Sequence, residues 1–311
     1  MNYQKNRFLS SDERTQITYH LFLPEQAPLA VLQICHDVSE HLLRYRDLAE
    51  YLCSFGIAVC GCDHKGHGES LDRSGILGVF DGGGALRDLC EDQKILYDLM
   101  RKKYRHLPYL FLGQGMGELI LRLFVGRYKQ TADGLILMSC MGPDLPVRKW
   151  ALWVTIQSLL SKKDAPCQKL KDRMFSKNAE GSKALSRDEQ AVRGYDEDPL
   201  CGFALCPRAY GQLVDALKQA NGENAPDIEL SLPVMICAGS DDPLSPDALS
   251  ARSLHESFSM AELCSLSLKI YQGARHDLIH ETNKQEVFSD LKDFILRVAE
   301  GVQAARVGSY F

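Results

Sequence analysis

Short apolar runs alternate with longer segments of helical periodicity along most of the 311-residue chain. The runs are rich in residues that favour strands, and turn-forming residues follow them. They lie at residues 17–23, 30–35, 57–62, 109–112, 134–139, 234–238 and 268–271. Strands that alternate with helices form βαβ units, so the pattern predicts a mostly parallel sheet with helices on its faces.

Three segments carry the apolar spacing of a helix. In residues 86–100 and 287–298, apolar side chains recur every three or four positions. The segment after Gly117, ELILRLFVGRY, is apolar nearly all round, which predicts a helix buried at the centre of the molecule. Residues 305–311 are expected to form a loose tail.

The alternation stops between residues 143 and 232, where the sequence is charged, helical in composition and poor in strand signals. We therefore expect residues 1–142 and 233–311 to form an α/β core. Residues 143–232 are expected to form a helical cap over the carboxyl edge of the sheet, where open α/β sheets bind ligands.

Composition places the chain among ordinary soluble globular proteins, with 45% hydrophobic and 25% charged residues. A net charge of −5 argues against nucleic acid as a partner, because such binding depends on clustered Lys and Arg. The polar amino terminus does not resemble a secretory signal. No apolar run reaches the roughly 18 residues of a spanning helix, so the expected location is cytoplasmic.

Eleven cysteines are present, an odd number, and none forms a C-x-x-C pair. Several fall in the strand-like runs, which favours small buried hydrophobes in a reducing compartment over disulfides or zinc. His64 and His67 lie near Cys62, but without a second group of ligands they do not predict a metal site.

The stretch YLFLGQGMGELI combines an apolar strand, alternating glycines and an apolar helix. In one large enzyme class the middle of such a turn carries the nucleophile, as G-x-S-x-G. Here that position is Gly115, which has no side chain. A dinucleotide-binding G-x-G-x-x-G would need glycine at 118, where Glu118 would face the pyrophosphate, so we reject that alternative.

Two later loops carry an acid and a histidine in the order expected after such a turn. Asp242 follows the apolar run PVMICAG, and His276 follows LSLKIYQGA. A buried acid fixes the tautomer of a catalytic histidine and stabilises its cation. The loop CHDVSEH follows an earlier strand, and in such folds it supplies one backbone N–H to an oxyanion hole. Val38 and Met116 are the predicted donors.

Together these segments resemble the monoacylglycerol lipase and lysophospholipase-like α/β-hydrolases of the serine aminopeptidase type. HDVSEHLLRYRDLAEYL is similar to that family's H-G-x-x-E-H-x-x-R-Y, and DHKGHGES to its D-H-x-G-H-G-x-S. GQGMGE resembles its G-H-S-M-G turn, while GSDDP and YQGARHDLIHE resemble its acid and histidine loops. The cap segment LSRDEQAVRGYDEDPLCGF is also similar, so the resemblance covers nearly the whole chain.

The resemblance implies an α/β-hydrolase fold with a helical lid, hydrolysis of fatty-acid carboxylic esters through an acyl-serine, and no cofactor. It assigns the acid to Asp242, the base to His276 and the nucleophile to position 115. The expected ligand is a small-molecule acyl ester or a fatty acid. Gly115 stands where the family has serine, and Asp37 stands where it has the glycine after His36. A carboxylate at 37 would repel an oxyanion.

Four interpretations of Gly115 are open: a natural pseudo-hydrolase, a Ser→Gly variant of an active esterase, a nucleophile moved to Ser139 or Cys140, and a water activated by Asp242 and His276. A single engineered change would not account for Asp37, which favours the first. Such a chain would bind an acyl ligand or a protein partner, or hydrolyse activated esters feebly.

The cap stretch WALWVTI invites two interpretations. Trp150 and Trp153 would line an acyl pocket together with His36 and Asp37, or contact a membrane surface transiently. Alternatively, some of these side chains pack within the cap itself.

Overall fold

An eight-stranded sheet organises the computed structural model, which describes residues 1–79, 85–162, 164–175, 181–222, 225 and 227–308. The strands are β1 (Asn2–Leu9), β2 (Gln16–Leu23), β3 (Ala30–Cys35), β4 (Ile57–Cys62), β5 (Tyr109–Gln114), β6 (Gly134–Met138), β7 (Val234–Gly239) and β8 (Leu266–Tyr271). Their order across the sheet is β1-β2-β4-β3-β5-β6-β7-β8. The strands from β4 to β8 in that order are parallel, and β1 and β2 are antiparallel to their neighbours.

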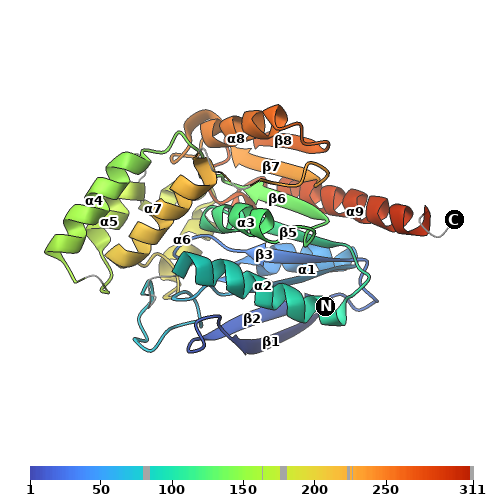
Figure 1. Cartoon of the computed structure of the whole chain (residues 1–311), viewed down its shortest axis with the longest axis horizontal. Helices are drawn as coiled ribbons and strands as arrows, with labels where there is room; N and C mark the ends of the chain where they lie inside the picture. The colour runs from blue at the N-terminus through green and yellow to red at the C-terminus, as the bar shows by residue number, and fades with distance from the viewer. Residues whose placement is uncertain (80–84, 163, 176–180, 223–224, 226, 309–311) are drawn as a thin grey trace.

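Helices cover both faces of this sheet (Figure 1). The α-helices are α1 (Arg46–Ser54), α2 (Ala85–Lys103), α3 (Met116–Arg127), α4 (Val147–Leu160), α5 (Gln168–Phe175), α6 (Glu189–Glu197), α7 (Pro207–Asn221), α8 (Leu249–Met260) and α9 (Lys284–Gly308). Short 3-10 helices occur at η1 (Leu42–Tyr45), η2 (Gly181–Ala184), η3 (Pro246–Ala248) and η4 (Leu278–His280). One apolar core joins the sheet to α2, α3 and α8, and a second joins it to α1 and α9.

The predicted fold class is confirmed, and each predicted strand is present with ends within two residues of the expectation. One strand was missed. β1 is an edge strand whose side chains are mostly exposed, so its sequence NYQKNRFL carries no apolar run. The expected loose tail is also wrong at residues 305–308, because α9 continues to Gly308. Gln303, Ala304, Ala305 and Arg306 are good helix formers; residues 309–311 lie outside the described residues.

Between β6 and β7 the described chain forms α4, α5, α6 and α7 and contributes no strand to the sheet. Figure 1 shows α4, α5 and α7 grouped at one end of the sheet. Helix α7 packs on both α4 and α3, so the cap rests on the helix that begins at the glycine turn. None of the helices in the described part of the chain is long and apolar enough to cross a membrane.

The start of α3 lies directly against the end of β3. A Cβ atom on Gly117 would lie 1.9 Å from the carbonyl oxygen of Cys35, so no larger residue fits there without moving the backbone. This close approach brings the turn after β5 next to the loop after β3.

We therefore expect Gly117→Ala to lower the free energy of unfolding by about 1–3 kcal/mol or more, because it overpacks backbone against backbone. Gly194→Ala in α6 is the matched control, since nothing lies within 4 Å of its Cβ position. The control should raise stability by about 0.5–1 kcal/mol through helix propensity. Urea denaturation measures both, and equal effects of the two substitutions would contradict the packing argument.

Candidate active site

The structure brings the predicted acid and histidine together at the carboxyl edge of the sheet. Asp242 lies in the loop after β7, and His276 in the loop after β8. The Nδ1 atom of His276 lies 2.7 Å from Oδ2 of Asp242, and both side chains are buried. The other oxygen of Asp242 accepts a hydrogen bond of 2.9 Å from the Leu244 N–H. The acid is therefore held in place from two sides.

Gly115 lies at the sharp turn between β5 and α3, with φ 53° and ψ −114°. This positive φ strains any residue with a Cβ atom, as at strained nucleophile turns. A Cβ atom at 115 would lie 2.1 Å from Oδ1 and 2.4 Å from Oδ2 of Asp37. The space that a side chain at 115 would use is thus filled by the carboxylate of Asp37.

That carboxylate occupies the predicted oxyanion hole. Its Oδ1 accepts hydrogen bonds from the backbone N–H groups of Val38, at 2.6 Å, and Met116, at 2.7 Å. Its Oδ2 lies 3.0 Å from Nε2 of His276. Both predicted donors converge on one point, but the atom they bind belongs to the chain itself.

His276 is held as a cation between two carboxylates. Burial disfavours the charged ring, but Asp242 and then Asp37 outweigh it and raise the pKa of His276 well above its usual 6.5. The imidazolium donates Nδ1–H to Asp242 and Nε2–H to Asp37. At neutral pH this ring has no lone pair with which to accept a proton from an attacking group.

The loop that carries Asp37 is fixed by a buried network. Glu40 Oε1 accepts from the Asp37 N–H and from the Tyr45 hydroxyl, each at 2.8 Å. Its Oε2 accepts from Nε of Arg44, also at 2.8 Å. These residues were not predicted as part of the site, although their E-x-x-x-R-Y spacing was visible in the quoted segment. Asp37 is therefore positioned by a rigid loop.

Gln114 and the residue after His276 extend this network. The Gln114 side-chain amide donates to Oδ1 of Asp277 at 3.3 Å, and Arg44 forms an ion pair with the same carboxylate. Gln114 thus ties the glycine turn to the histidine loop. Gln114 is absent from the described cavity lining.

His36 was expected to line the pocket, but it is absent from the described cavity lining. The residue directly follows β3 and is buried. Its Nε2 accepts from the His64 N–H at 3.0 Å, and its ring centroid is 4.0 Å from that of His64 and 5.5 Å from that of His67. Burial lowers the pKa of His64 to about 4 and that of His67 to about 3. The three rings are neutral packing elements.

The two tryptophans of the cap are also absent from the described cavity lining. Trp150 is buried and packs on Phe175, with ring centroids 5.7 Å apart. The ring of Trp153 is half-buried and lies 5.9 Å from the guanidinium of Arg173. Their expected role in the pocket is corrected: both pack within the cap.

A cavity of about 360 Å³ opens above the buried carboxylate and lies between core and cap. Asp37, Gly115 and His276 form its floor, together with Val38 and Leu244. The cap supplies most of the remaining walls, from α5, η2, the end of α6 and the loop after it. A small amphiphile fits a cavity of this size and mixed lining.

Neither proposed substitute for the missing nucleophile faces the site. The Ser139 hydroxyl donates to the backbone carbonyl of His276, not to its ring. The Cys140 thiol is buried, and burial raises its pKa well above the usual value, which leaves no thiolate. The relocated-nucleophile interpretation therefore has no support in the geometry.

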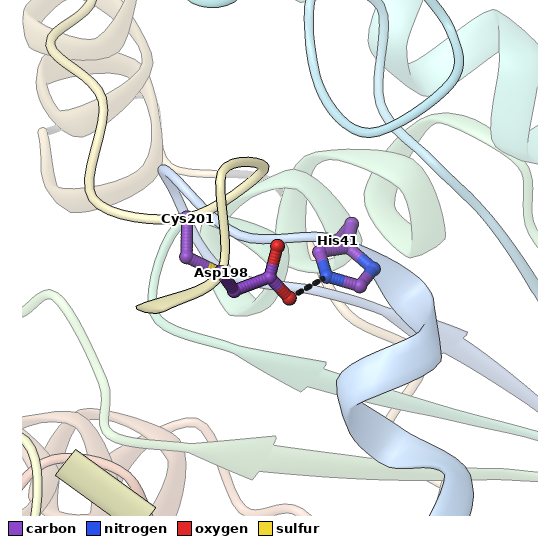
Figure 2. A group of neighbouring side chains, drawn as sticks. All are labelled: His41, Asp198 and Cys201. Atoms are coloured by element: carbon purple, nitrogen blue, oxygen red, sulfur yellow. Dashed lines mark hydrogen bonds and ion pairs between the residues drawn. The ribbon is translucent and has the colours of Figure 1, made fainter. Parts of the chain in front are cut away.

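Figure 2 shows His41, Asp198 and Cys201, the one group of three potential metal ligands among the described residues. Their ligand atoms lie within 4.8 Å of one another. Nε2 of His41 already pairs with Oδ2 of Asp198 at 2.8 Å, and burial raises the pKa of the Cys201 thiol. A protonated thiol is a poor ligand. The group instead joins the cap to the loop that carries Asp37.

Comparison with known proteins gives a consistent picture. Residues 26–283 match the family model described as serine aminopeptidase, S33. The chain is 30% identical to the monoglyceride lipase of Homo sapiens over 83% of its length and 78% of that protein. It is 26% identical to the monoacylglycerol lipase of Mycolicibacterium smegmatis over 90% of its length and 93% of that protein.

Solved structures share the fold. A structure titled "Lipase (Open form)" superposes with a TM-score of 0.86 at 24% identity, covering 96% of this chain and 99% of the other. A soluble variant of the monoglyceride lipase of Saccharomyces cerevisiae, in complex with a substrate analogue, superposes with a TM-score of 0.73 at 19% identity. That match covers 95% of this chain and 94% of the other.

The raised pKa of His276 makes a pH-dependent contribution to stability. Because the folded-state pKa exceeds the ordinary 6.5, the contribution is fully present below pH 6.5 and is lost as pH rises through the raised value. Asp37→Asn keeps an oxygen for the two backbone donors but removes the charge that faces the ring. We expect it to lower the free energy of unfolding by roughly 1.5–3 kcal/mol near pH 6, and the loss to shrink as pH rises.

Denaturation by urea at several pH values between about 5.5 and 9 measures this difference. Asp241→Asn is the control, because Asp241 is exposed, lies beside Asp242, and its carboxylate accepts a hydrogen bond from the Ser240 hydroxyl. A loss in Asp37→Asn that is the same at every pH would contradict the charged pairing.

Proposed function

Since this chain belongs to the hydrolase family described as serine aminopeptidase, S33, we propose that it is a lipid-ester-hydrolase relative that binds amphiphilic acyl ligands without forming an acyl-enzyme. The observation that carries the proposal is the position of the Asp37 carboxylate. It accepts hydrogen bonds from the two backbone N–H groups of the oxyanion hole and from Nε2–H of His276. The similarity to monoglyceride lipases supports a lipid ligand for the cavity.

Two physical reasons argue against covalent catalysis. Position 115 has no nucleophilic atom, and a substrate carbonyl could reach the backbone donors only after Asp37 left them. Hydrogen bonds to a charged group contribute roughly 1.5–3 kcal/mol each, and Asp37 makes three. A neutral ester carbonyl is a weaker acceptor and would not displace it.

The interpretation as a Ser→Gly variant of an active esterase finds less support. A serine at 115 would place its Cβ inside the Asp37 carboxylate. Glycine at 115 and aspartate at 37 therefore fit each other, whereas aspartate at 37 would collide with the serine that the family has at 115. Activation of water by the Asp242–His276 pair is also disfavoured, because Nε2 of His276 is already engaged.

We expect Gly115→Ser alone to leave hydrolysis of p-nitrophenyl esters near background, since Asp37 still fills the site. The double substitution Asp37→Gly with Gly115→Ser clears the oxyanion hole and supplies the hydroxyl. It should raise kcat/KM by at least about 100-fold over the wild type, a fraction of what a complete triad contributes.

Asp37→Gly alone is the matched control and should remain near background, because it has an open hole but no nucleophile. His276→Ala in the double variant should abolish the gain. Strong activity in Gly115→Ser alone would show that Asp37 moves aside, and the proposal would then be wrong.

Contact of the cap with a membrane surface remains part of the proposal. One face of α4 is apolar and exposed: Leu152, Ile156, Leu159 and Leu160 follow helical spacing, and Leu159 and Leu160 are 82% and 76% exposed. The opposite face, with Trp150 and Val154, packs inside the cap. Arg148, Lys149 and Lys162 flank the exposed face. Apolar helix faces with basic flanks suit the interface of anionic lipid.

The double substitution Leu159→Asp with Leu160→Asp should reduce cosedimentation with anionic phospholipid vesicles by about fivefold or more. It removes apolar side chains that the membrane would bury, and it adds two carboxylates that the anionic lipid repels. Met260→Asp is the control: Met260 is 74% exposed on α8, which lies outside the cap insertion and is not part of the α4 face. Equal loss of binding in both variants, or no binding by the wild type, would argue against a membrane role for α4.

A further inference from the structure

We infer that the cavity selects ligands whose polar head donates a hydrogen bond, such as alcohols and amines, and rejects free carboxylates. The inference rests on the proposed function, because it assumes that the cavity holds an amphiphile. The sequence predicted either an acyl ester or a fatty acid as the ligand. The inference excludes the fatty acid from that ligand class.

The first argument is the hydrogen-bonding capacity left on the cavity floor. A carboxylate offers about four lone-pair sites. Asp37 uses three of them, for the N–H groups of Val38 and Met116 and for the ring of His276. Because Asp37 lines the cavity, we expect the remaining lone-pair site on its Oδ2 to accept a hydrogen bond from a ligand that brings a donor.

The same three contacts leave no hydrogen-bond donor among them for an acidic head group. In an open oxyanion hole, the two backbone donors and the histidine would bind one carboxylate of a ligand. Here all three are taken by Asp37. A fatty acid would set its own carboxylate against that of Asp37, with no described donor on the floor left to neutralise it.

Negative charge on the cap walls also disfavours an anionic head group. Asp172 and Asp196 line the cavity and add negative charge. Among the described lining residues outside the floor, Lys171 is the one cation, and its ammonium already donates to the backbone carbonyl of Gly202.

Apolar side chains complete the match to an amphiphile. Val38 and Leu244 on the floor and Phe175 and Leu185 on the cap walls line the cavity with apolar side chains. They offer a surface for a short hydrocarbon chain whose head reaches Asp37. A monoacylglycerol, which carries free hydroxyls, belongs to the favoured class, and its fatty-acid product does not.

Three ligands with the same eight-carbon chain separate the head groups: 1-octanol, octylamine and octanoate. Isothermal titration should give a Kd for octanol and octylamine at least about tenfold below that for octanoate. In Asp37→Gly the two donors and His276 are released. The Kd for octanoate should then fall at least about tenfold, and the preference should reverse or vanish.

Asp241→Asn removes a nearby exposed carboxylate without touching the floor, and its ligand preference should match the wild type. Equal affinity of the wild type for octanol and octanoate, or an octanoate affinity unchanged in Asp37→Gly, overturns the inference. Failure of all three ligands to bind either protein overturns the proposed function as well. Circular dichroism and thermal melting verify that each variant is folded.

Discussion

The carboxylate of Asp37 is the centre on which the rest of this site depends. It binds the two backbone N–H groups that an oxyanion would use and the ring that a nucleophile would use. A hydrolase of this architecture leaves that position open for substrate. Here the chain fills it with its own charge, which keeps the histidine protonated and the oxyanion donors satisfied.

The structure keeps the arrangement of acid, histidine and backbone donors that a lipid-ester hydrolase uses, but an aspartate side chain occupies the place of the substrate oxygen. The acid, the histidine and the converging backbone donors are all in place, and Glu40 and Arg44 hold the loop that presents Asp37. Glycine at 115 is what makes room for the carboxylate. Two departures from the family pattern, distant in sequence, are therefore one structural feature.

The Asp37 carboxylate also determines the polarity of the cavity floor, because it lines the cavity. Its floor presents a partly used acceptor, its cap walls carry Asp172 and Asp196, and apolar side chains complete its lining; these features are the basis of the proposed preference for a neutral or cationic amphiphile. The cap closes the cavity and presents an exposed apolar face on α4. The insertion thus contributes both the upper walls of the cavity and the exposed apolar face.

The sequence by itself determined every strand except β1, the helices α2, α3 and α9, the helical character of the cap, and the order of turn, acid and histidine, because apolar periodicity and turn residues are local signals. It missed β1, whose edge position needs no apolar run, and it misplaced His36, Trp150 and Trp153, whose burial depends on partners elsewhere in the chain. Only the tertiary structure decided that Asp37 fills the oxyanion hole. Its contacts span 79 positions to Met116 and 239 to His276, and no local pattern encodes which oxygen will meet which donor.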